Sequence, residues 1–209
     1  MTEILVVDDH PAICFALKAI LSNVPDYHVS TASDGIIAMA LLKELEPALV
    51  ILDIALARMD GLEILQRIRR YGDNVKVLVL SGQSSELYAE RACRAGANGY
   101  VSKDEDLSHL PALCKLILDG YSCFPSFLMT QLTASVSGDT RTPLEKLSDR
   151  ELTVLRYLAE GLTNKEIASR LLLSNKTIST YKTRLLAKLN ISSAEEMQKL
   201  LEDLQASIR

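Results

Sequence analysis

Two patterns of hydrophobic and polar positions follow one another along the chain. Up to residue 120, short runs of consecutive apolar residues alternate with longer segments in which apolar residues recur every three or four positions. Uninterrupted apolar runs are typical of strands buried on both faces of a parallel sheet, and the longer spacing is typical of the helices that cover it. The expected strands are 4–7, 28–31, 49–52, 75–80 and 99–101, and the expected helices are 10–23, 35–46, 61–71, 85–95 and 106–119.

Five strands alternating with five helices imply right-handed crossovers between neighbouring parallel strands. Residues 1–120 are therefore predicted to form a doubly wound (βα)5 domain of the α/β class, with a five-stranded parallel sheet. Residues 121–145 carry turn-forming and polar residues without a regular period, and are predicted to be a linker with one helical turn near 127–132.

From residue 146 to 209 the pattern is helical throughout. Ser148, Thr163 and Ser193 are each followed three residues later by Glu, which is the signature of a capping box at the start of a helix. Ser174 opens one more helix. The second domain is therefore expected to be all-α, with four helices.

Composition changes this picture little. The four cysteines are widely spaced and form no C-x-x-C pair, so neither a zinc site nor a disulfide framework is indicated. The acidic start of the chain does not resemble a signal peptide, and the sequence has no run of about 20 apolar residues that could span a bilayer. A cytoplasmic protein with reduced thiols and no membrane partner is expected.

Charge is distributed unevenly between the two domains. Residues 1–120 contain 17 acidic and 11 basic residues, whereas residues 121–209 contain 12 basic and 10 acidic residues. Within 163–190, six basic residues are opposed by a single Glu. This excess suits the binding of a polyanion, although a solvated helical surface would carry the same run of charge.

Reactive side chains stand at the ends of four expected strands. Asp8 and Asp9 follow the first strand, Asp53 the third, Ser81 ends the fourth and Lys103 the fifth. Because ligands of doubly wound sheets bind beyond the carboxyl ends of the strands, we expect these groups to share one pocket. A lone Asp at a strand end is more often a turn former or a helix cap, so the interpretation depends on the joint pattern.

Three carboxylates in one pocket repel one another unless a cation lies between them, and Mg²⁺ is the hard cation that takes carboxylate and water oxygens. One carboxylate could then attack a phosphoryl donor and become an aspartyl phosphate. The metal and Lys103 would neutralise charge on the transferred oxygens, and Ser81 could donate a hydrogen bond to them.

Residues 1–120 resemble the receiver domain family. The resemblance is carried by ILVVDDH at 4–10, LDI at 52–54 with MDG at 59–61, VLSG at 79–82 and GYVSK at 99–103. It implies that Asp53 is the phosphoacceptor and that Asp9 binds Mg²⁺ directly.

The same resemblance implies that Asp8 acts on the metal mostly through water and that the carbonyl of Ala55 completes the protein ligands. Ser81 and Tyr100 resemble the hydroxyl and aromatic pair that rearranges on phosphorylation. Ala57 stands where many receivers have proline, which should alter the loop after Asp53 without removing a reactive group.

The second domain contains a helix, a turn near residues 173–174 and a second helix, which together indicate a helix-turn-helix. One face of the second helix is apolar, with Ile178, Tyr181, Leu185 and Leu189 expected to face the core. Another face carries small polar side chains, which could enter a major groove. The basic residues that flank this face suit contacts with phosphates. An amphipathic helix in a plain bundle would show the same periodicity. The expected DNA-binding residues are Lys165, Lys176, Thr177, Ser179, Thr180, Lys182, Thr183, Arg184 and Lys188.

Residues 147–155, 164–168 and 173–178 resemble the LuxR-type domain. The two halves together resemble the NarL/FixJ class of response regulators, and the segments 174–186 and 120–126 are similar to the BvgA/EvgA branch of that class. Because the reading face carries short Ser and Thr side chains, direct readout is expected to involve thymine methyls, water and DNA shape.

The resemblance implies a transcription factor that a sensor histidine kinase or a histidine-phosphotransfer domain phosphorylates on Asp53. The new charge recruits Ser81 and Lys103, Tyr100 turns inward, and domain contacts loosen or a homodimer forms. Two recognition helices then bind double-stranded promoter DNA, with RNA polymerase as a further partner. The last helix is expected either to form the dimer surface or to close the bundle core, through Met197, Leu200, Leu201 and Leu204.

Two alternatives stay open. The chain could be a constitutive DNA-binding regulator for which phosphorylation is unimportant. It could also be an aspartate-based phosphoryl-transfer enzyme, but such enzymes carry an acid two residues after the nucleophile, where this chain has Ala55. We therefore expect no enzyme activity beyond autophosphorylation from a phosphodonor and slow self-dephosphorylation.

Overall fold

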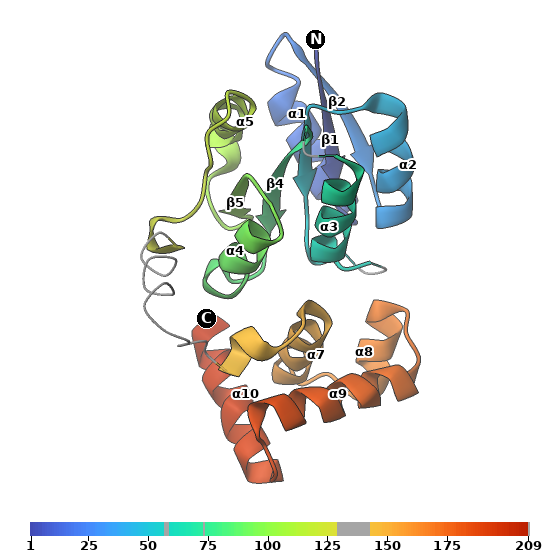
Figure 1. Cartoon of the computed structure of the whole chain (residues 1–209), viewed down its shortest axis with the longest axis vertical. Helices are drawn as coiled ribbons and strands as arrows, with labels where there is room; N and C mark the ends of the chain where they lie inside the picture. The colour runs from blue at the N-terminus through green and yellow to red at the C-terminus, as the bar shows by residue number, and fades with distance from the viewer. Residues whose placement is uncertain (57–58, 73, 129–142, 209) are drawn as a thin grey trace. The chain divides into compact units, whose positions relative to one another are not determined.

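The computed structural model describes residues 1–56, 59–72, 74–128 and 143–208. The chain divides into two compact units, Met1–Thr133 and Ala134–Arg209. The first unit contains a sheet covered by helices, and the second is helical (Figure 1).

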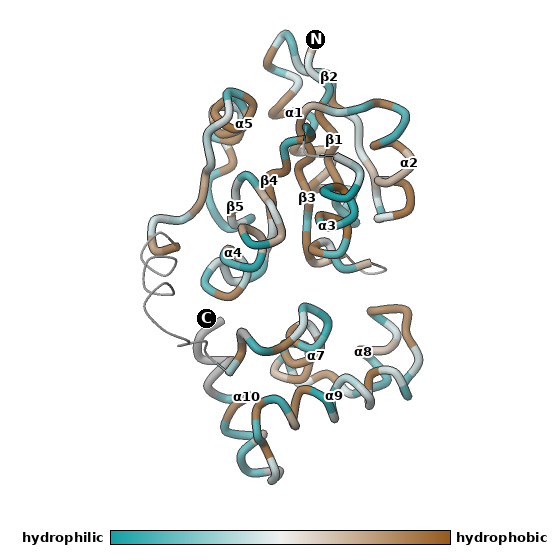
Figure 2. The backbone as a smooth tube through the Cα atoms, in the orientation of Figure 1, coloured by the Kyte–Doolittle hydropathy of each residue, from teal (hydrophilic) through white to brown (hydrophobic). Residues whose placement is uncertain are grey.

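All five strands of the first unit run parallel, in the order β2-β1-β3-β4-β5. The chain winds outward from β1 in both directions, which confirms the doubly wound fold and places the crevice beyond the carboxyl ends of β1 and β3. The three central strands, β1, β3 and β4, are hydrophobic along most of their length (Figure 2). Their bounds are Thr2–Val7 (β1), Tyr27–Ala32 (β2), Leu49–Leu52 (β3), Lys76–Ser81 (β4) and Gly99–Ser102 (β5).

Alternate residues of the strands point to opposite faces of the sheet, and both faces are covered. One face packs against α1 (Pro11–Leu21) and α5 (Leu110–Leu118) in a core that includes Ile4, Ile51 and Leu78. The remaining helices of the first unit are α2 (Gly35–Leu45), α3 (Gly61–Tyr71) and α4 (Ser85–Arg94).

The helix predicted over 106–119 is divided in the structure. A 3₁₀ turn, η1, covers Leu107–His109, and the Asp106 side chain caps it by accepting from the Ser108 amide. The α-helix follows with a proline in its first turn, where the missing N–H costs nothing. The helical turn predicted near 127–132 is helical at residues 126–128, and its other residues lie outside the described part of the chain, as does Ala57.

The second unit begins with a 3₁₀ turn, η2 (Pro143–Lys146), and contains four helices in its described part. Complete capping boxes at Ser148 and Thr163 open the first two helices, Ser174 caps the third, and Ser193 accepts the amide of Glu196 in the fourth, all as predicted. The helices are α7 (Asp149–Ala159), α8 (Asn164–Leu171), α9 (Asn175–Leu189) and α10 (Ala194–Ile208).

The core of the second unit agrees with the predicted apolar face of α9 at its centre. Ile178 and Leu185 are fully buried, whereas Tyr181 and Leu189 are half-buried. Met197 of α10 is also buried, and α10 contacts α7, so this part of the last helix closes the bundle core. None of the helices in the described residues is long and apolar enough to cross a membrane.

Candidate functional site

Adjacent strand ends bring the predicted acidic residues together. β1 and β3 pair in register up to Val7 and Leu52, and the Asp53 amide continues the ladder by donating to the Val7 carbonyl at 2.9 Å. The residues that follow the two strands, Asp8 and Asp53, therefore leave the sheet side by side. Their side chains are almost completely buried, and that of Asp9 is one quarter exposed.

Lys103 joins the two buried carboxylates. Its Nζ lies 2.6 Å from an oxygen of Asp8 and 2.6 Å from an oxygen of Asp53. Burial alone would lower the pKa of Lys103, but the charges and hydrogen bonds of Asp53 and Asp8 outweigh burial and raise this pKa above its usual value. The side chain is therefore a fixed ammonium that counters the acidic charge.

Asp53 receives two further hydrogen bonds, both on the oxygen that Lys103 does not contact. The buried hydroxyl of Ser81 donates to Oδ1 at 2.9 Å, and so does the amide of Ala55. These donors orient the carboxylate in the crevice. The carbonyl of Ala55 is predicted to bind the metal, and its amide also contributes to the site by orienting Asp53.

Tyr100 lies inward, with 2% of its surface exposed, and its hydroxyl donates to the Gln83 carbonyl at 2.8 Å. Burial raises the pKa of this hydroxyl well above its ordinary value, so it is a permanent donor. Phosphorylation is expected from the family resemblance to recruit Ser81 and Lys103 and to turn Tyr100 inward. In the structure all three already hold those positions, because the charge of Asp53 itself attracts two donors and Gln83 satisfies the buried phenol.

Sequence reasoning missed two residues of this site. The His10 ring nitrogen Nδ1 lies 2.9 Å from Asp9 and 3.1 Å from Asp8. Gly61 lets the start of α3 approach the residue after β3, because a Cβ there would lie 2.4 Å from the Asp53 carbonyl oxygen. His10 directly follows the acidic pair, which was a usable signal, whereas the crowding around Gly61 depends on tertiary packing.

The donor set fits a divalent cation. Asp8, Asp9, His10 and Asp53 each offer one ligand atom, and these atoms lie within 4.8 Å of one another. Ligands on opposite sides of a bound Mg²⁺ are about 4.2 Å apart, so the spread of the cluster matches this ion. Three carboxylates face a single ammonium in this cluster, an excess of negative charge that a divalent ion would offset.

The candidate DNA interface lies on α8 and α9. Six predicted residues are exposed on α9, Lys165 is exposed on α8, and Thr177 and Lys182 are half-buried. The Thr177 hydroxyl is 2.7 Å from that of Ser174, so Thr177 takes part in the cap of α9. The exposed α9 residues in question are Lys176, Ser179, Thr180, Thr183, Arg184 and Lys188.

Hydroxyl groups on this face are bound to the helix itself. Ser179, Thr180 and Thr183 each donate at 3.0 Å to the carbonyl four residues earlier. Since a hydroxyl has one proton, these groups act as acceptors toward a ligand for as long as they keep their bonds to the helix. Together with the threonine methyls, they suit thymine methyls and the amino groups of adenine and cytosine better than the acceptor edge of guanine.

Lys188, the last predicted DNA-binding residue, also forms an ion pair inside the bundle. Its Nζ lies 2.6 Å from Oε2 of Glu151, a carboxylate with 4% of its side chain exposed. The partner on α7 cannot be inferred from the local sequence, because the two residues are 37 positions apart. The ion pair links α7 to α9, so Lys188 stabilises the bundle.

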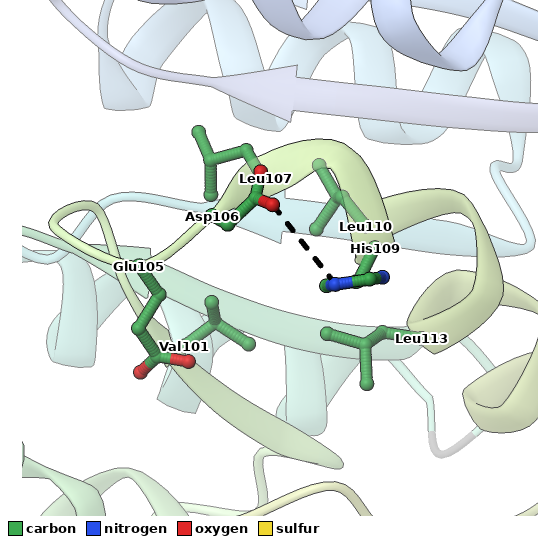
Figure 3. Close-up of a pocket in the computed structure, with 7 residues that line it drawn as sticks. All are labelled: Val101, Glu105, Asp106, Leu107, His109, Leu110 and Leu113. Atoms are coloured by element: carbon green, nitrogen blue, oxygen red, sulfur yellow. Dashed lines mark ion pairs between the residues drawn. The ribbon is translucent and has the colours of Figure 1, made fainter.

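A separate pocket of about 270 Å³ lies where β5 is connected to α5 (Figure 3). His109 lies 4.0 Å from Asp106 at its rim. The pocket holds none of the acidic residues described above, so it is distinct from the candidate phosphoryl site. It is lined by Val101, Glu105, Asp106, Leu107, His109, Leu110 and Leu113.

Comparison with known families matches both halves of the chain. Residues 4–115 match the response regulator receiver domain, and residues 145–200 match the bacterial regulatory proteins of the luxR family. Among solved structures, RcsB from Salmonella enterica serovar Typhimurium, bound to promoter rprA in the presence of phosphomimetic BeF₃⁻, is similar with a TM-score of 0.64 and 25% identity. The similarity covers 97% of this chain and 99% of that one.

Relatives of known name match over nearly the whole length. The chain is 40% identical over 196 residues to the virulence-factor transcription regulator BvgA of Bordetella pertussis, covering 93% of this chain and 94% of the relative. It is 42% identical over 201 residues to the fimbriae Z protein of Salmonella typhimurium, with 93% of each chain covered. It is 31% identical over 193 residues to the DNA-binding transcriptional activator EvgA of Escherichia coli, with 92% and 94% covered.

Proposed function

Since the chain belongs to the response regulators that join a receiver domain to a LuxR-type DNA-binding domain, we propose that phosphorylation of Asp53 controls its binding to promoter DNA. In this proposal residues 1–120 are the receiver, 121–145 the linker and 146–209 the DNA-binding domain. A sensor histidine kinase or a histidine-phosphotransfer domain is the phosphodonor, and a cytoplasmic location follows from these partners.

One observation carries the proposal: the Asp53 carboxylate lies in an acidic crevice with Lys103 on one oxygen and Ser81 on the other. A carboxylate oxygen of Asp53 forms a bond to phosphorus while the bond between phosphorus and the donor breaks, and the bonding electron pair leaves with the donor. Lys103 neutralises the transferred oxygens, and the Ser81 hydroxyl donates to one of them.

Asp8, Asp9, Asp53 and the carbonyl of Ala55 would hold Mg²⁺, whose contribution when bound is to neutralise the phosphoryl oxygens. Ala55 offers no side chain to activate water, so self-dephosphorylation should be slow. The relatives are transcription regulators, and turnover of phosphate esters is not proposed for this chain.

On the DNA side, α9 enters the major groove with the face formed by Ser179, Thr180 and Thr183, and Lys165, Lys176, Lys182 and Arg184 contact phosphates. A homodimer would place two such helices on successive half-sites. RNA polymerase is a further proposed partner. The solved relative bound to promoter DNA with a phosphomimetic supports this arrangement.

The test measures binding of the full chain to a genomic fragment that the protein itself selects, with and without Mg²⁺ and BeF₃⁻. The wild-type protein should bind at least about tenfold more tightly with both present, a bias of ~1.4 kcal/mol. An Asp53→Asn protein should not respond. Equal enhancement of both proteins would overturn the proposal, and intact-mass measurement after acetyl phosphate treatment reports the modification directly.

The inward position of Tyr100 favours a second candidate, a regulator that binds DNA without phosphorylation. In that case the Asp53→Asn protein and untreated wild-type protein would both bind with the full affinity of the BeF₃⁻ complex. The same titrations therefore separate the two candidates.

A further inference from the structure

The chain that leaves α5 returns to the sheet and lies along the free edge of β5. We call residues 121–125 the return segment. Its Cys123 forms a parallel bridge with Gly99, in which the Cys123 amide donates to the Asn98 carbonyl at 2.9 Å. The Cys123 carbonyl accepts from the Tyr100 amide at 2.8 Å. These two bonds lie on either side of Gly99 and make the segment a short addition to the sheet.

Local sequence features build this return. Gly120 ends α5 with a φ of +98°, a conformation that other residues rarely adopt, and the next amide, of Tyr121, bonds back to the Leu116 carbonyl at 3.0 Å. The chain thereby reverses direction toward β5. Cys123 then packs against the apolar core beside α5, so the segment is held by side-chain burial as well as by its backbone.

Gly99 is the residue that allows the close approach. A Cβ at this position would lie 2.6 Å from the Cys123 carbonyl oxygen, a distance that real Cβ atoms essentially never show. It would also lie 3.0 Å from Leu78 and 3.1 Å from Ile117 in the core. Any larger residue at position 99 must therefore displace the carbonyl that holds Tyr100.

Tyr100 is thus fixed from two directions. Its hydroxyl donates to the carbonyl of Gln83, which follows β4, the strand that ends at Ser81. Its amide donates to the Cys123 carbonyl in the return segment. The residue before Gly99 is anchored as well, because the Asn98 side chain accepts from the Val77 amide and from Arg69. A shift of the Tyr100 backbone would therefore alter the hydrogen bond between the Tyr100 amide and the Cys123 carbonyl, at the start of the proposed linker.

We propose that Gly99 and the return segment are positioning elements that tie Tyr100 to the connection with the DNA-binding domain. The Cys123 carbonyl fixes the backbone of Tyr100, and the response of the receiver site reaches the second domain along this hydrogen-bonded path. This inference rests on the proposed function. By linkage, occupancy of DNA would act back on the phosphorylated receiver through the same bond.

The first measurement uses hydrogen exchange on the wild-type full chain, with and without Mg²⁺ and BeF₃⁻. The amides of Tyr100 and Cys123 should change their exchange rates when the phosphomimetic binds. If both amides exchange identically in the two states while DNA binding tightens, the inference is wrong and the proposed function stands. If DNA binding does not respond but the two amides do, the proposed function fails and the connection to the receiver site is supported.

The second measurement uses two matched pairs of variants. Gly99→Ala displaces the Cys123 carbonyl, whereas Gly72→Ala adds a methyl where no atom lies within 4 Å. Cys123→Pro removes the amide that bonds to Asn98, and Cys123→Ala removes the same thiol but keeps the amide. The Cys123 pair decides the matter if Gly99→Ala does not fold.

In Gly99→Ala and Cys123→Pro, exchange of the Tyr100 amide should rise about fivefold to tenfold, as expected for the loss of one backbone bond. Acetyl phosphate should still modify Asp53 to the wild-type extent, because no group of the acidic site has changed. The enhancement of DNA binding by BeF₃⁻ should fall to about onefold, a split that a general loss of stability would not produce. Faster exchange with an unchanged enhancement would overturn the inference.

Discussion

Replacing Lys188 by methionine tests whether this residue serves the bundle or the DNA. The change keeps a side chain of similar length and removes the ammonium that lies 2.6 Å from Glu151. Glu151 would then keep the bond from the Ser148 amide at 2.7 Å, and its carboxylate would lose its ion-pair partner. Because Glu151 is also the capping residue of α7, the loss would be felt at the start of that helix.

The free energy that the bundle loses in Lys188→Met lies between two limits. Exposed ion pairs contribute ~0–1 kcal/mol, whereas removing one partner of a buried pair costs ~3–5 kcal/mol. Glu151 is buried, but 42% of the Lys188 side chain is exposed, so water can enter the vacated position. We therefore expect a loss of ~1–2 kcal/mol, which is about a 5-fold to 30-fold rise in the population of the opened bundle.

Native-state hydrogen exchange of α7 and α9 in the full chain measures this opening, and the salt dependence of DNA binding measures phosphate contacts. Lys176→Met is the matched control, because Lys176 is exposed and takes part in none of the ion pairs found among the described residues. Lys176→Met should change the free energy of bundle opening by no more than ~0.5 kcal/mol. It should reduce the slope of the logarithm of the DNA-binding constant against the logarithm of salt concentration by about 0.9. The reasoning is refuted if Lys188→Met reduces the slope equally and leaves opening unchanged.

The same pair gives a pH dependence with a definite sign. Burial alone would raise the pKa of Glu151, but hydrogen bonds from Lys188 and Ser148 outweigh it and hold this pKa below its ordinary value of 4.5. A lowered carboxyl pKa stabilises the fold above the unfolded value, and the contribution is lost as the pH falls through the folded value. In the wild-type protein the bundle should therefore weaken as the pH falls below ~4.5. In Lys188→Met this acid-induced loss should be smaller, because the pKa of Glu151 is then depressed less.

Three further changes test the two sites. Lys103→Met should slow modification of Asp53 by acetyl phosphate by about 10²-fold, measured by intact mass, because the cation that faces the transferred oxygens is removed. Gly61→Ala should destabilise the first unit by ~1–3 kcal/mol in thermal unfolding, since the added methyl would overlap the Asp53 backbone, whereas Gly82→Ala, with no atom within 4 Å, should not. Thr180→Val keeps a methyl group at this position, so the protein should still prefer the same base there. Thr180→Ser removes the methyl, so the protein should no longer prefer thymidine over deoxyuridine in competition binding.

The strands could be predicted because their burial leaves a direct record in the sequence. β3 is buried at all four positions and appears as an uninterrupted apolar run, so its bounds match the prediction. β2 lies at the sheet edge, where only Val29 and Ala32 are buried, and its pattern was correspondingly weak. Helix starts were equally readable, because the capping contacts of Ser148 and Thr163 involve residues three positions apart.

The missed features depend on contacts between distant parts of the chain. Nothing near Lys188 in the sequence indicates that a buried Glu151 faces it, so the ion pair between them could not be predicted. Similarly, the bond between the Tyr100 amide and the Cys123 carbonyl forms only because α5 carries the chain back to the edge of β5. For that reason the irregular pattern of the predicted linker does not reveal that residues 121–125 pack on the first unit.

The inward position of Tyr100 limits how much phosphorylation can change DNA binding. If binding requires a receiver state that is populated to a fraction f before phosphorylation, the apparent dissociation constant is the intrinsic one divided by f. Full activation can then tighten binding by at most 1/f. If the inward positions of Ser81, Lys103 and Tyr100 are the binding-competent state, f is large, and the enhancement should lie nearer tenfold than the ~10⁴-fold bias needed to move a 1:99 equilibrium to 99:1. An enhancement above about 10³-fold would show that the inward position of these three side chains is not the binding-competent state, and that the change must occur elsewhere in the chain.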